Sequence, residues 1–428
     1  MSSGILHKAL ATLEHHAVWH AFVVGGCMPI MLLIACFAFT RTGRGAGSNP
    51  YPRGAWLAGQ GDLSRELFWN RKGPLRIGMV WVPATFAAEY ILVSSTPGPG
   101  RTNIVSRILT GIRESGKRAI VHDTAGTVVE RLSRPGKDTI LNPRDERSCV
   151  WIPWAGVPRD HPNDRMAEFT IPHQGKNPLW AKAARGTMIA VMRKLVAEQR
   201  MLVSAAIDTL VRPDLKALSR FVVGTNGAAF VSVEGERAVA AIRAELASVL
   251  RGLAYLDATD KGLSIQEWVI DEDDGWPFIT VKTDQLPTLR PLIMVWLDIV
   301  ISAIMNMAPD RRRHLYCVID ELPSLQKLPS LGDFLARARK YRGCGISGFQ
   351  SGLQVAATFG AQVAVAITGY CSTWVALRAN DRGTGRFVSE NLAQVEQIEA
   401  NEGMSYGVND MHDGVNLSRV QVTGCWSC

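Results

Sequence analysis

Beyond residue 62, short hydrophobic runs alternate along the chain with longer amphipathic stretches. The short runs are rich in β-branched and aromatic residues, and they are Tyr90–Ser94, Arg118–Val121, Thr139–Leu141, Phe278–Val281, Leu315–Ile319, Gly345–Gly348 and Thr373–Leu377. Continuous apolar runs predict strands, and strands that alternate with helices predict a mostly parallel sheet. We therefore expect an α/β domain whose sheet is covered by helices on both faces.

A long helical segment separates the third of these runs from the fourth. Residues 178–256 have the period of amphipathic helices and almost no strand signal. We interpret residues 161–261 as an all-α domain inserted into the α/β domain. The α/β domain would then consist of two parts, residues 63–160 and residues 262–428.

The N-terminal segment, residues 1–40, carries a different pattern. Residues 21–39 are uncharged, and this length is close to the ~20 residues that a transmembrane helix needs. Lys8 is the only Lys or Arg before this run, whereas Arg41 and Arg44 follow it. The positive-inside rule therefore predicts a single-pass anchor with the main body in the cytoplasm. A removed signal peptide is the alternative, which the basic flank after the run disfavours. Residues 41–62 are rich in Gly and Pro and are expected to form a linker.

Composition narrows the class of protein further. The chain has 428 residues, of which 47% are hydrophobic and 20% charged, and these values exclude a disordered or fibrous protein. Lys and Arg exceed Asp and Glu by 47 to 39, which gives a net charge of +8 that suits a polyanionic partner such as nucleic acid. The 8 cysteines are dispersed, without zinc-finger or disulfide-scaffold spacing, and this indicates a reducing compartment.

The first chemical motif follows the predicted strand Tyr90–Ser94. Gly98, Gly100, Arg101 and Thr102 form a Gly-rich turn into an amphipathic helix, which is the geometry that cradles phosphates. The pattern departs from G-x-x-x-x-G-K-[ST], because Ser95 replaces the first Gly and Arg101 replaces the Lys. A plain Pro/Gly turn is the alternative interpretation.

The second motif follows the predicted strand Leu315–Ile319. Asp320 and Glu321 come directly after this strand, where ligands bind in parallel sheets. This is a Walker B arrangement, in which Asp320 would hold Mg²⁺ through water and Glu321 would polarise the attacking water. A solvated strand end is the alternative.

Two further features lie downstream. Gln350 follows the strand Gly345–Gly348 and is a candidate sensor of a γ-phosphate. A basic run precedes that strand, and its members are Arg337, Arg339, Lys340 and Arg342. One of these arginines could act across a subunit boundary as an arginine finger, although most charge runs are solvated faces.

These residues together resemble a known family. The stretches STPGPGRT, AIVHDTAG, ILNPRDERS, LRPLI, VIDELPSLQKLPSL and GFQS, in this order, resemble the type IV coupling proteins of bacterial conjugation, the TraD/TraG group. The resemblance covers most of residues 50–420. It implies a hexameric inner-membrane ring ATPase with a RecA-like domain and an all-α domain. Such a protein links the relaxase–DNA complex to the type IV secretion channel, and it is expected to move single-stranded DNA with ATP and Mg²⁺.

The resemblance also assigns roles to individual residues. Gly100, Arg101 and Thr102 match the family's P-loop, and Asp320 with Glu321 matches its Walker B acids. By the same resemblance, Gln350 matches the sensor glutamine and Arg339 the candidate arginine finger.

Three departures from the family keep other interpretations open. Ser95 and Arg101 stand where the family has Gly and Lys, and a single predicted span replaces the usual two. The chain also ends soon after Leu417–Arg419, whereas the family continues, and a truncated copy would have this pattern. The leading hypothesis is a DNA-dependent ATPase of conjugation, and whether it hydrolyses ATP stays open. The alternatives are a non-catalytic membrane scaffold that docks transfer proteins, or a decayed gene product.

Overall fold

A computed structural model describes most of the chain beyond residue 58. The described residues are 31, 33–34, 53–54, 59–69, 72–78, 80–83, 89–96, 98, 100–152, 178–200, 202–211, 215–231, 236–250, 252–256, 262–310, 313–326, 328, 330–378, 382–391, 395–406 and 411–422. Contacts divide the chain into two units. One is Ala58–Asn391, and the other combines Met1–Leu57 with Leu392–Ser427.

A seven-stranded sheet forms the centre of the larger unit. Its strands are β4 (Tyr90–Ser94), β5 (Arg118–Asp123), β6 (Thr139–Leu141), β7 (Pro277–Thr280), β8 (Leu315–Ile319), β9 (Gly343–Phe349) and β10 (Cys371–Ala376). They are arranged in the order β10-β4-β9-β8-β5-β7-β6, and every neighbouring pair is parallel. All seven predicted strands are therefore confirmed, with ends that differ by a few residues.

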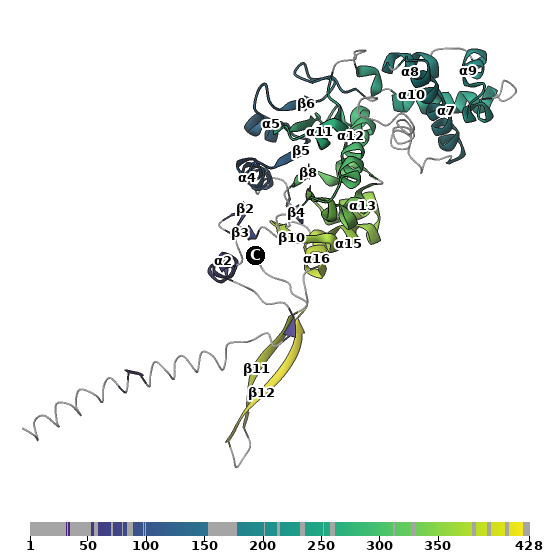
Figure 1. Cartoon of the computed structure of the whole chain (residues 1–428). Helices are drawn as coiled ribbons and strands as arrows, with labels where there is room; N and C mark the ends of the chain where they lie inside the picture. The colour runs from purple at the N-terminus through teal and green to yellow at the C-terminus, as the bar shows by residue number, and fades with distance from the viewer. Residues whose placement is uncertain are drawn as a thin grey trace, which may run out of the picture. The chain divides into compact units, whose positions relative to one another are not determined.

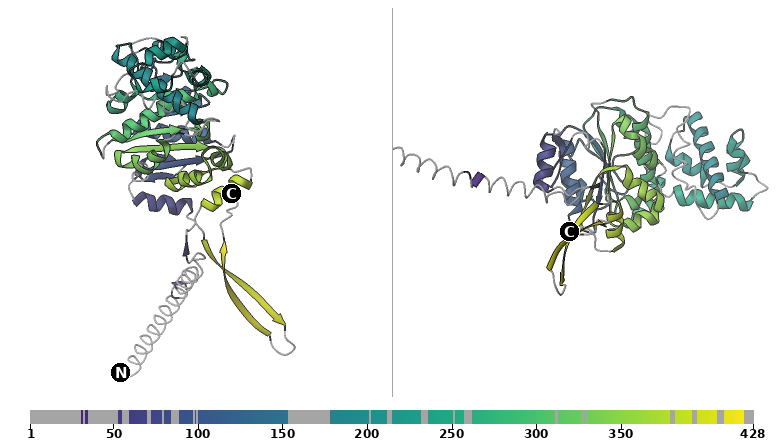
Figure 2. Two further views of the ribbon diagram at one scale, coloured as in Figure 1. Left: turned by 90° about the vertical axis from the view of Figure 1, so that its right-hand side faces the viewer. Right: turned by 90° about the horizontal axis from the view of Figure 1, so that it is seen from below.

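Helices cover both faces of this sheet, as predicted. One face packs against α4 (Arg101–Glu114) and α5 (Thr127–Leu132), and the other packs against α12 (Leu286–Asn306) and the helices α13 (Ser330–Arg337), α14 (Gly352–Phe359) and α15 (Ala361–Tyr370). Figures 1 and 2 show these two helical layers on either side of the strands. Side chains alternate between the layers along each strand, so that Ile91 and Val93 face α4 whereas Leu92 faces the α12 layer.

The described residues between β6 and β7 contain helices and no named strand. The helices are α7 (Pro178–Ala197), α8 (Val203–Leu210), α9 (Leu215–Val222), η1 (Asn226–Ala229), α10 (Glu236–Leu250), η3 (Leu253–Tyr255) and α11 (Ile265–Ile270). They lie in the same contact unit as the sheet, and their buried residues continue the core on the α12 side. The predicted domain boundaries, including the separate all-α domain, stay predictions.

Several smaller elements have no counterpart in the prediction. The larger unit also contains α2 (Gln60–Trp69), the antiparallel pair β2 (Lys72–Ile77) and β3 (Val80–Pro83), the short helices η4 (Leu322–Leu325) and η5 (Ala338–Tyr341), and α16 (Arg382–Asn391). In the smaller unit, β1 (Arg53–Gly54), β11 (Val395–Tyr406) and β12 (Met411–Val422) form an antiparallel sheet in the order β1-β11-β12. Residues 395–406 and 411–422 are rich in polar residues, so apolar runs could not reveal them.

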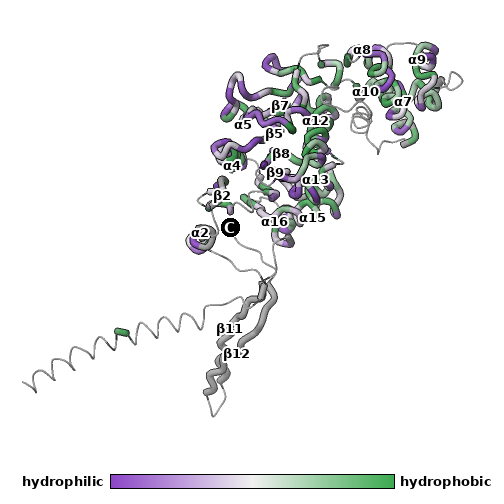
Figure 3. The backbone as a smooth tube through the Cα atoms, in the orientation of Figure 1, coloured by the Kyte–Doolittle hydropathy of each residue, from purple (hydrophilic) through white to green (hydrophobic). Residues whose placement is uncertain are grey.

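The apolar helix α12 belongs to the core. It is long and hydrophobic enough to cross a membrane, and Figure 3 colours much of it as hydrophobic. It is also mostly buried, because it packs along the sheet. The bent pair α14 and α15 passes the same test of length and composition, with a bend of 118°. The predicted span 21–39 lies outside the described residues except for Met31, Leu33 and Ile34, which are helical and exposed. The membrane anchor therefore stays a prediction.

Candidate functional site

Three strands in the middle of the sheet end side by side. Because β9 lies between β4 and β8 and all three are parallel, the residues that follow them meet at the carboxyl edge of the sheet. These residues are the Gly-rich turn after β4, Asp320 and Glu321 after β8, and Gln350 after β9. The three motifs that lie up to 255 positions apart in the sequence are thus brought together at the edge where parallel sheets bind ligands.

The Gly-rich turn is held by its neighbouring strands. The N–H of Ser95 donates to the carbonyl of Phe349 at 3.2 Å, and the N–H of Thr96 donates to the carbonyl of Arg378 at 3.1 Å. Gly100 precedes the first residue of α4 with φ of 95°, a left-handed conformation that glycine adopts without strain. The turn and the first residues of α4 line a pocket of about 340 Å³ together with Gln350. The free N–H groups at a helix N-terminus favour an anion at such a place.

Arg101 crosses from this turn to the acids after β8. Its Nη1 donates to Oε2 of Glu321 at 2.9 Å, and its Nε lies 3.7 Å from Oδ1 of Asp320. Gln350 donates from Nε2 to the same Oε2 of Glu321 at 2.9 Å. The side chains of Arg101 and Glu321 are each only 14% exposed. The structure therefore joins Arg101, Asp320, Glu321 and Gln350 in one largely buried polar network.

Asp320 has unused capacity to bind a cation. Burial raises the pKa of its carboxyl above the ordinary value, Arg101 opposes this, and the charges of Asp123 and Glu321 add to it. Its Oδ1 has no hydrogen-bond partner among the described residues. A buried carboxylate oxygen without a donor fits a hard cation such as Mg²⁺. Within the described part of the chain, however, no group of three or more His, Cys, Asp and Glu side chains could hold a metal by itself. Such a cation would therefore need further ligands, for which Thr102 at the start of α4 is a candidate.

Two residues at the end of β5, Asp123 and Thr124, also lie at this edge, and neither was among the predicted site residues. The carboxylate of Asp123 accepts hydrogen bonds from four backbone N–H groups at the start of α5, namely those of Ala125, Gly126, Val128 and Val129, at 2.8–3.2 Å. Next to it, the side chain of Thr124 lowers the pKa of the Asp320 carboxyl, against the effect of burial. The signal for both is an Asp-Thr pair one residue beyond the predicted strand Arg118–Val121, at the same edge as Asp320.

Arg339 does not join this site within the chain. It lies in η5, before β9, and therefore at the amino edge of the sheet, whereas Gln350 lies beyond the other end of β9. Its Nη2 donates to Oε1 of Glu89 at 2.8 Å, and its side chain is 68% exposed. Arg337, from the same basic run, pairs with Asp333 at 2.6 Å. Arg339 is thus exposed, paired with Glu89, and at the opposite edge of the sheet from the site.

Comparison with known families identifies the larger part of the chain. Residues 74–424 match the model of the type IV secretion-system coupling protein DNA-binding domain. Coupling protein TraD of Escherichia coli strain K12 is 26% identical over 433 aligned residues, which cover 98% of this chain. The chain spans 60% of the length of that relative.

Solved structures of coupling proteins have the same fold. The bacterial conjugative coupling protein TrwB, in its unbound monoclinic form, superposes with a TM-score of 0.77 at 26% identity, and the match covers 87% of this chain and 86% of TrwB. TrwB in complex with a non-hydrolysable ATP analogue gives a TM-score of 0.74 at 26% identity, over 81% of this chain and 84% of that one. TrwB with ADP and Mg²⁺ gives 0.73 at 26% identity, over the same shares of the two chains. With a family match over most of its length and the same parallel sheet, the chain belongs to the type IV secretion-system coupling proteins.

Proposed function

We propose that this chain couples conjugative DNA processing to a type IV secretion channel and moves single-stranded DNA through it with ATP and Mg²⁺. The observation that carries this proposal is the pocket of about 340 Å³ at the start of α4, lined in part by Arg101 and Gln350, whose side chains both contact Glu321. The family membership supports it, as do the complexes of TrwB with an ATP analogue and with ADP and Mg²⁺.

The Gly-rich turn is the proposed phosphate-binding element. Gly98 and Gly100 let the backbone approach the phosphates closely, and Arg101 supplies a positive charge next to them. Thr102 and Asp320 are the proposed ligands of Mg²⁺, because a hydroxyl and an unpaired carboxylate oxygen suit that ion. When bound, Mg²⁺ supplies the charge that neutralises the phosphates, and ATP supplies the bond to be hydrolysed.

Glu321 and Gln350 are the proposed groups that act on the attacking water. The carboxylate of Glu321 can accept a proton or a hydrogen bond from water, and Gln350 fixes its orientation through the 2.9 Å contact. Arg339 is proposed to act on the site of a neighbouring subunit, since its exposed side chain lies at the opposite edge of its own sheet. This role requires a ring, for which we propose a homo-hexamer.

The other partners follow from the family. We propose the relaxase of the relaxosome and the subunits of the secretion channel as protein partners, and the bacterial inner membrane as the location. The uncharged residues 21–39 would form the single span, with the main body in the cytoplasm.

A non-catalytic scaffold is the second candidate, and one contact favours it. Arg101 already binds Glu321 at 2.9 Å and lies beside Asp320, so the two acids are partly neutralised by the chain itself. A planar guanidinium also cannot fill the compact place of a lysine ammonium. Such a protein would dock transfer proteins and bind nucleotide weakly without hydrolysing it.

ATP hydrolysis by the detergent-solubilised full chain tests both candidates. The natural chain, Arg101→Lys and Glu321→Gln are compared with and without single-stranded DNA. DNA-stimulated hydrolysis that Glu321→Gln abolishes would establish the motor. Hydrolysis by Arg101→Lys alone would establish a sound fold and favour the scaffold. If the natural chain and both variants fail to bind nucleotide, the ATPase proposal is wrong.

A further inference from the structure

A second pocket lies at the carboxyl end of the edge strand β6. The loop Pro143–Val150 forms one wall, and Tyr255 and Leu256, at the end of η3, form the other. The pocket measures about 360 Å³, which is within the range of small-ligand sites. Four strand spacings of about 4.8 Å separate β6 from β9, so this pocket lies roughly 20 Å along the sheet from the nucleotide site.

The loop that carries this pocket is rigidly built. The N–H of Arg144 donates to Oδ1 of Asn142 at 3.0 Å, and the N–H of Asp145 donates to the carbonyl of Asn142 at 2.8 Å. Asn142 is itself buried and donates to Oε1 of Gln285 at 3.2 Å. The loop closes where the N–H of Cys149 donates to the carbonyl of Ile140 at 2.8 Å. The side chain of Arg144 is thus presented from a fixed backbone.

Arg144 differs from Arg113 and Arg118, two other arginines that lie over aromatic rings. Arg113 lies 3.9 Å from the centroid of Trp276 and also binds Asp138, and Arg118 lies 4.5 Å from the centroid of Trp268 and donates to backbone carbonyls. Arg144 lies 5.5 Å from the centroid of the Tyr255 ring and has no hydrogen-bond acceptor or anion among the described residues. None of the described residues therefore occupies its side-chain donors or neutralises its charge.

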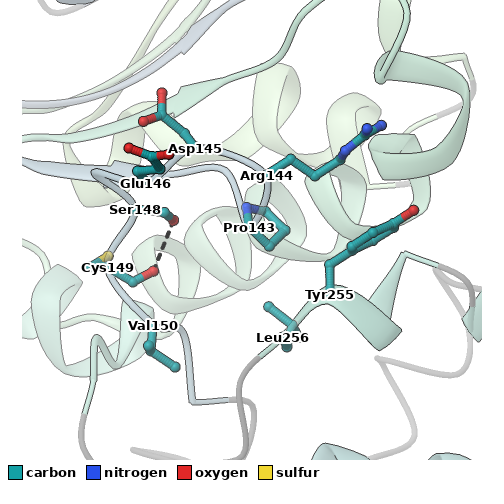
Figure 4. Close-up of a pocket in the computed structure, with 9 residues that line it drawn as sticks. All are labelled: Pro143, Arg144, Asp145, Glu146, Ser148, Cys149, Val150, Tyr255 and Leu256. Carbon is teal, nitrogen blue, oxygen red and sulfur yellow. Dashed lines mark hydrogen bonds between the residues drawn. The ribbon is translucent and has the colours of Figure 1, made fainter.

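Figure 4 shows how the polar and apolar groups of the pocket are distributed. Arg144 extends toward Tyr255 on one side, Asp145 and Glu146 lie on the other, and Pro143 lies between them. Asp145 is already paired, because Arg147 donates to it through Nε at 3.0 Å and Nη2 at 2.8 Å. The guanidinium of Arg144 lies over one face of the Tyr255 ring, and because Tyr255 is 42% exposed, the ring still offers an aromatic surface to a ligand. A free arginine next to an exposed aromatic ring is the combination that binds one phosphate and one base of a single strand.

We infer that Arg144 and Tyr255 form a contact site for one nucleotide of single-stranded DNA, with the phosphate on Arg144 and the base stacked on Tyr255. This inference rests on the proposed function, since it places part of the DNA contact of a coupling protein. Glu146 is an exposed residue that lines the same pocket, and its carboxylate can accept a hydrogen bond from the exocyclic amine of a base. The site lies away from the nucleotide pocket, so DNA and ATP can be bound at the same time.

Binding of a fluorescent single-stranded oligonucleotide to the detergent-solubilised full chain, measured by anisotropy over 50–200 mM salt, tests the inference. We expect Tyr255→Ala to weaken binding by about fivefold to 150-fold, which corresponds to the loss of one stacked base, whereas Tyr255→Phe keeps the ring and the affinity. Arg144→Gln should lower the salt slope by about one. Arg147→Gln removes the same charge three residues away, from an arginine that is already paired, and should have a smaller effect.

An oligonucleotide with an abasic position provides a second readout that does not depend on protein stability. The natural chain should lose affinity when the bound nucleotide lacks its base, and Tyr255→Ala should be insensitive to that change. Equal affinity of the natural chain, Tyr255→Ala and Arg144→Gln for the intact strand would overturn the inference, as would equal effects of Arg144→Gln and Arg147→Gln. If the natural chain itself does not bind single-stranded DNA, the proposed function fails at its DNA-binding step, and the inference fails with it.

Discussion

Two buried aspartates, Asp138 and Asp320, lie at opposite edges of one sheet and differ in the number of hydrogen-bond donors that surround their carboxylates. Asp138, before β6 at the amino edge, accepts from Arg113 at 2.8 Å, from Arg134 at 3.3 Å and from the backbone N–H groups of Arg134 and Trp276 at 2.6 and 2.9 Å. Asp320, at the carboxyl edge, has one arginine at 3.7 Å, and its Oδ1 has no hydrogen-bond donor within the described part of the chain. Their side chains are 1% and 5% exposed, so burial does not distinguish them. The number of hydrogen-bond donors distinguishes them. A carboxylate whose oxygens all have donors stabilises the fold, whereas one with an oxygen left without a donor can still bind a ligand.

The largest expected effect comes from breaking the saturated network. Asp138→Asn removes a buried charge that compensates the partly buried Arg113, and we expect a loss of about 3–5 kcal/mol in the free energy of unfolding. Asp320→Asn removes a partly unsatisfied carboxylate and should change the same quantity by less than about 1 kcal/mol. Urea unfolding of the detergent-solubilised chain, followed by circular dichroism, measures both. Equal losses in the two variants would show that donor number does not separate structural from functional aspartates here.

His122 provides the second test, because it is another buried and unpaired group at the carboxyl edge. It is fully buried, neither ring nitrogen has a partner among the described residues, and burial lowers its pKa to about 4. An unfolded histidine binds a proton below about pH 6.5, whereas the folded one stays neutral until about pH 4. Its contribution to stability is therefore fully present above pH 6.5 and is lost as the pH falls. We expect a loss of about 2 kcal/mol between pH 7 and pH 4.5.

The pH dependence of urea unfolding in the natural chain and in His122→Phe measures this contribution. The variant should lose most of the decline between pH 6.5 and pH 4.5. Asp320 acts in the opposite direction, because its raised pKa makes the folded chain bind a proton more readily than the unfolded chain. An identical decline in both proteins would assign the pH dependence to other groups.

The strands of the sheet could be predicted from the sequence because most of them are buried on both faces. All five residues of β4 and all five of β8 are buried, and this burial produces the continuous apolar runs Tyr90–Ser94 and Leu315–Ile319. The Gly-rich turn, Asp320 and Gln350 could be found for a related reason, since polar residues directly after such runs must lie at the carboxyl edge. The polar strand β11 gave no apolar run and was missed.

The contacts between side chains could not be predicted. Arg101 and Glu321 lie 220 positions apart, and their 2.9 Å contact depends on a strand order that places β9 between β4 and β8. Sequence patterns give the strands and not their order. The donors around Asp138 come from α4, from the loop before β6 and from Trp276, the residue before β7, so its saturation is likewise visible only in the folded chain.

The third prediction concerns Glu321, which lies beside Asp320 at the carboxyl edge. Glu321→Gln removes the charge that holds Arg101, and a charged hydrogen bond is worth about 1.5–3 kcal/mol, of which the amide retains a part. We expect the released Arg101 to increase the affinity for ATP about fivefold. Equilibrium binding of a fluorescent ATP analogue in the presence of Mg²⁺ measures this. Glu390→Gln, in an exposed pair with Arg386, is the matched control and should have no effect. A lower affinity in Glu321→Gln would mean that Glu321 supports nucleotide binding directly.

The smallest expected effect on stability is at the amino edge, where Arg339 pairs with Glu89. Because the arginine is 68% exposed, solvent screens the pair, and Arg339→Ala should change the free energy of unfolding by only about 0.5 kcal/mol. If the loss of Arg339 leaves the fold and the assembly intact but stops hydrolysis, Arg339 acts on the site of another subunit, because within its own chain it lies at the opposite edge of the sheet. Mixed assemblies of Arg339→Ala and Glu321→Gln subunits therefore sharpen the test. They are made in whichever background, natural or Arg101→Lys, hydrolyses ATP.

Each variant alone should be inactive, and the mixture should recover part of the activity, because some interfaces join an intact Glu321 to a neighbour's intact Arg339. A mixture as inactive as its components would exclude action across the interface and would leave Arg339 as a surface ion pair.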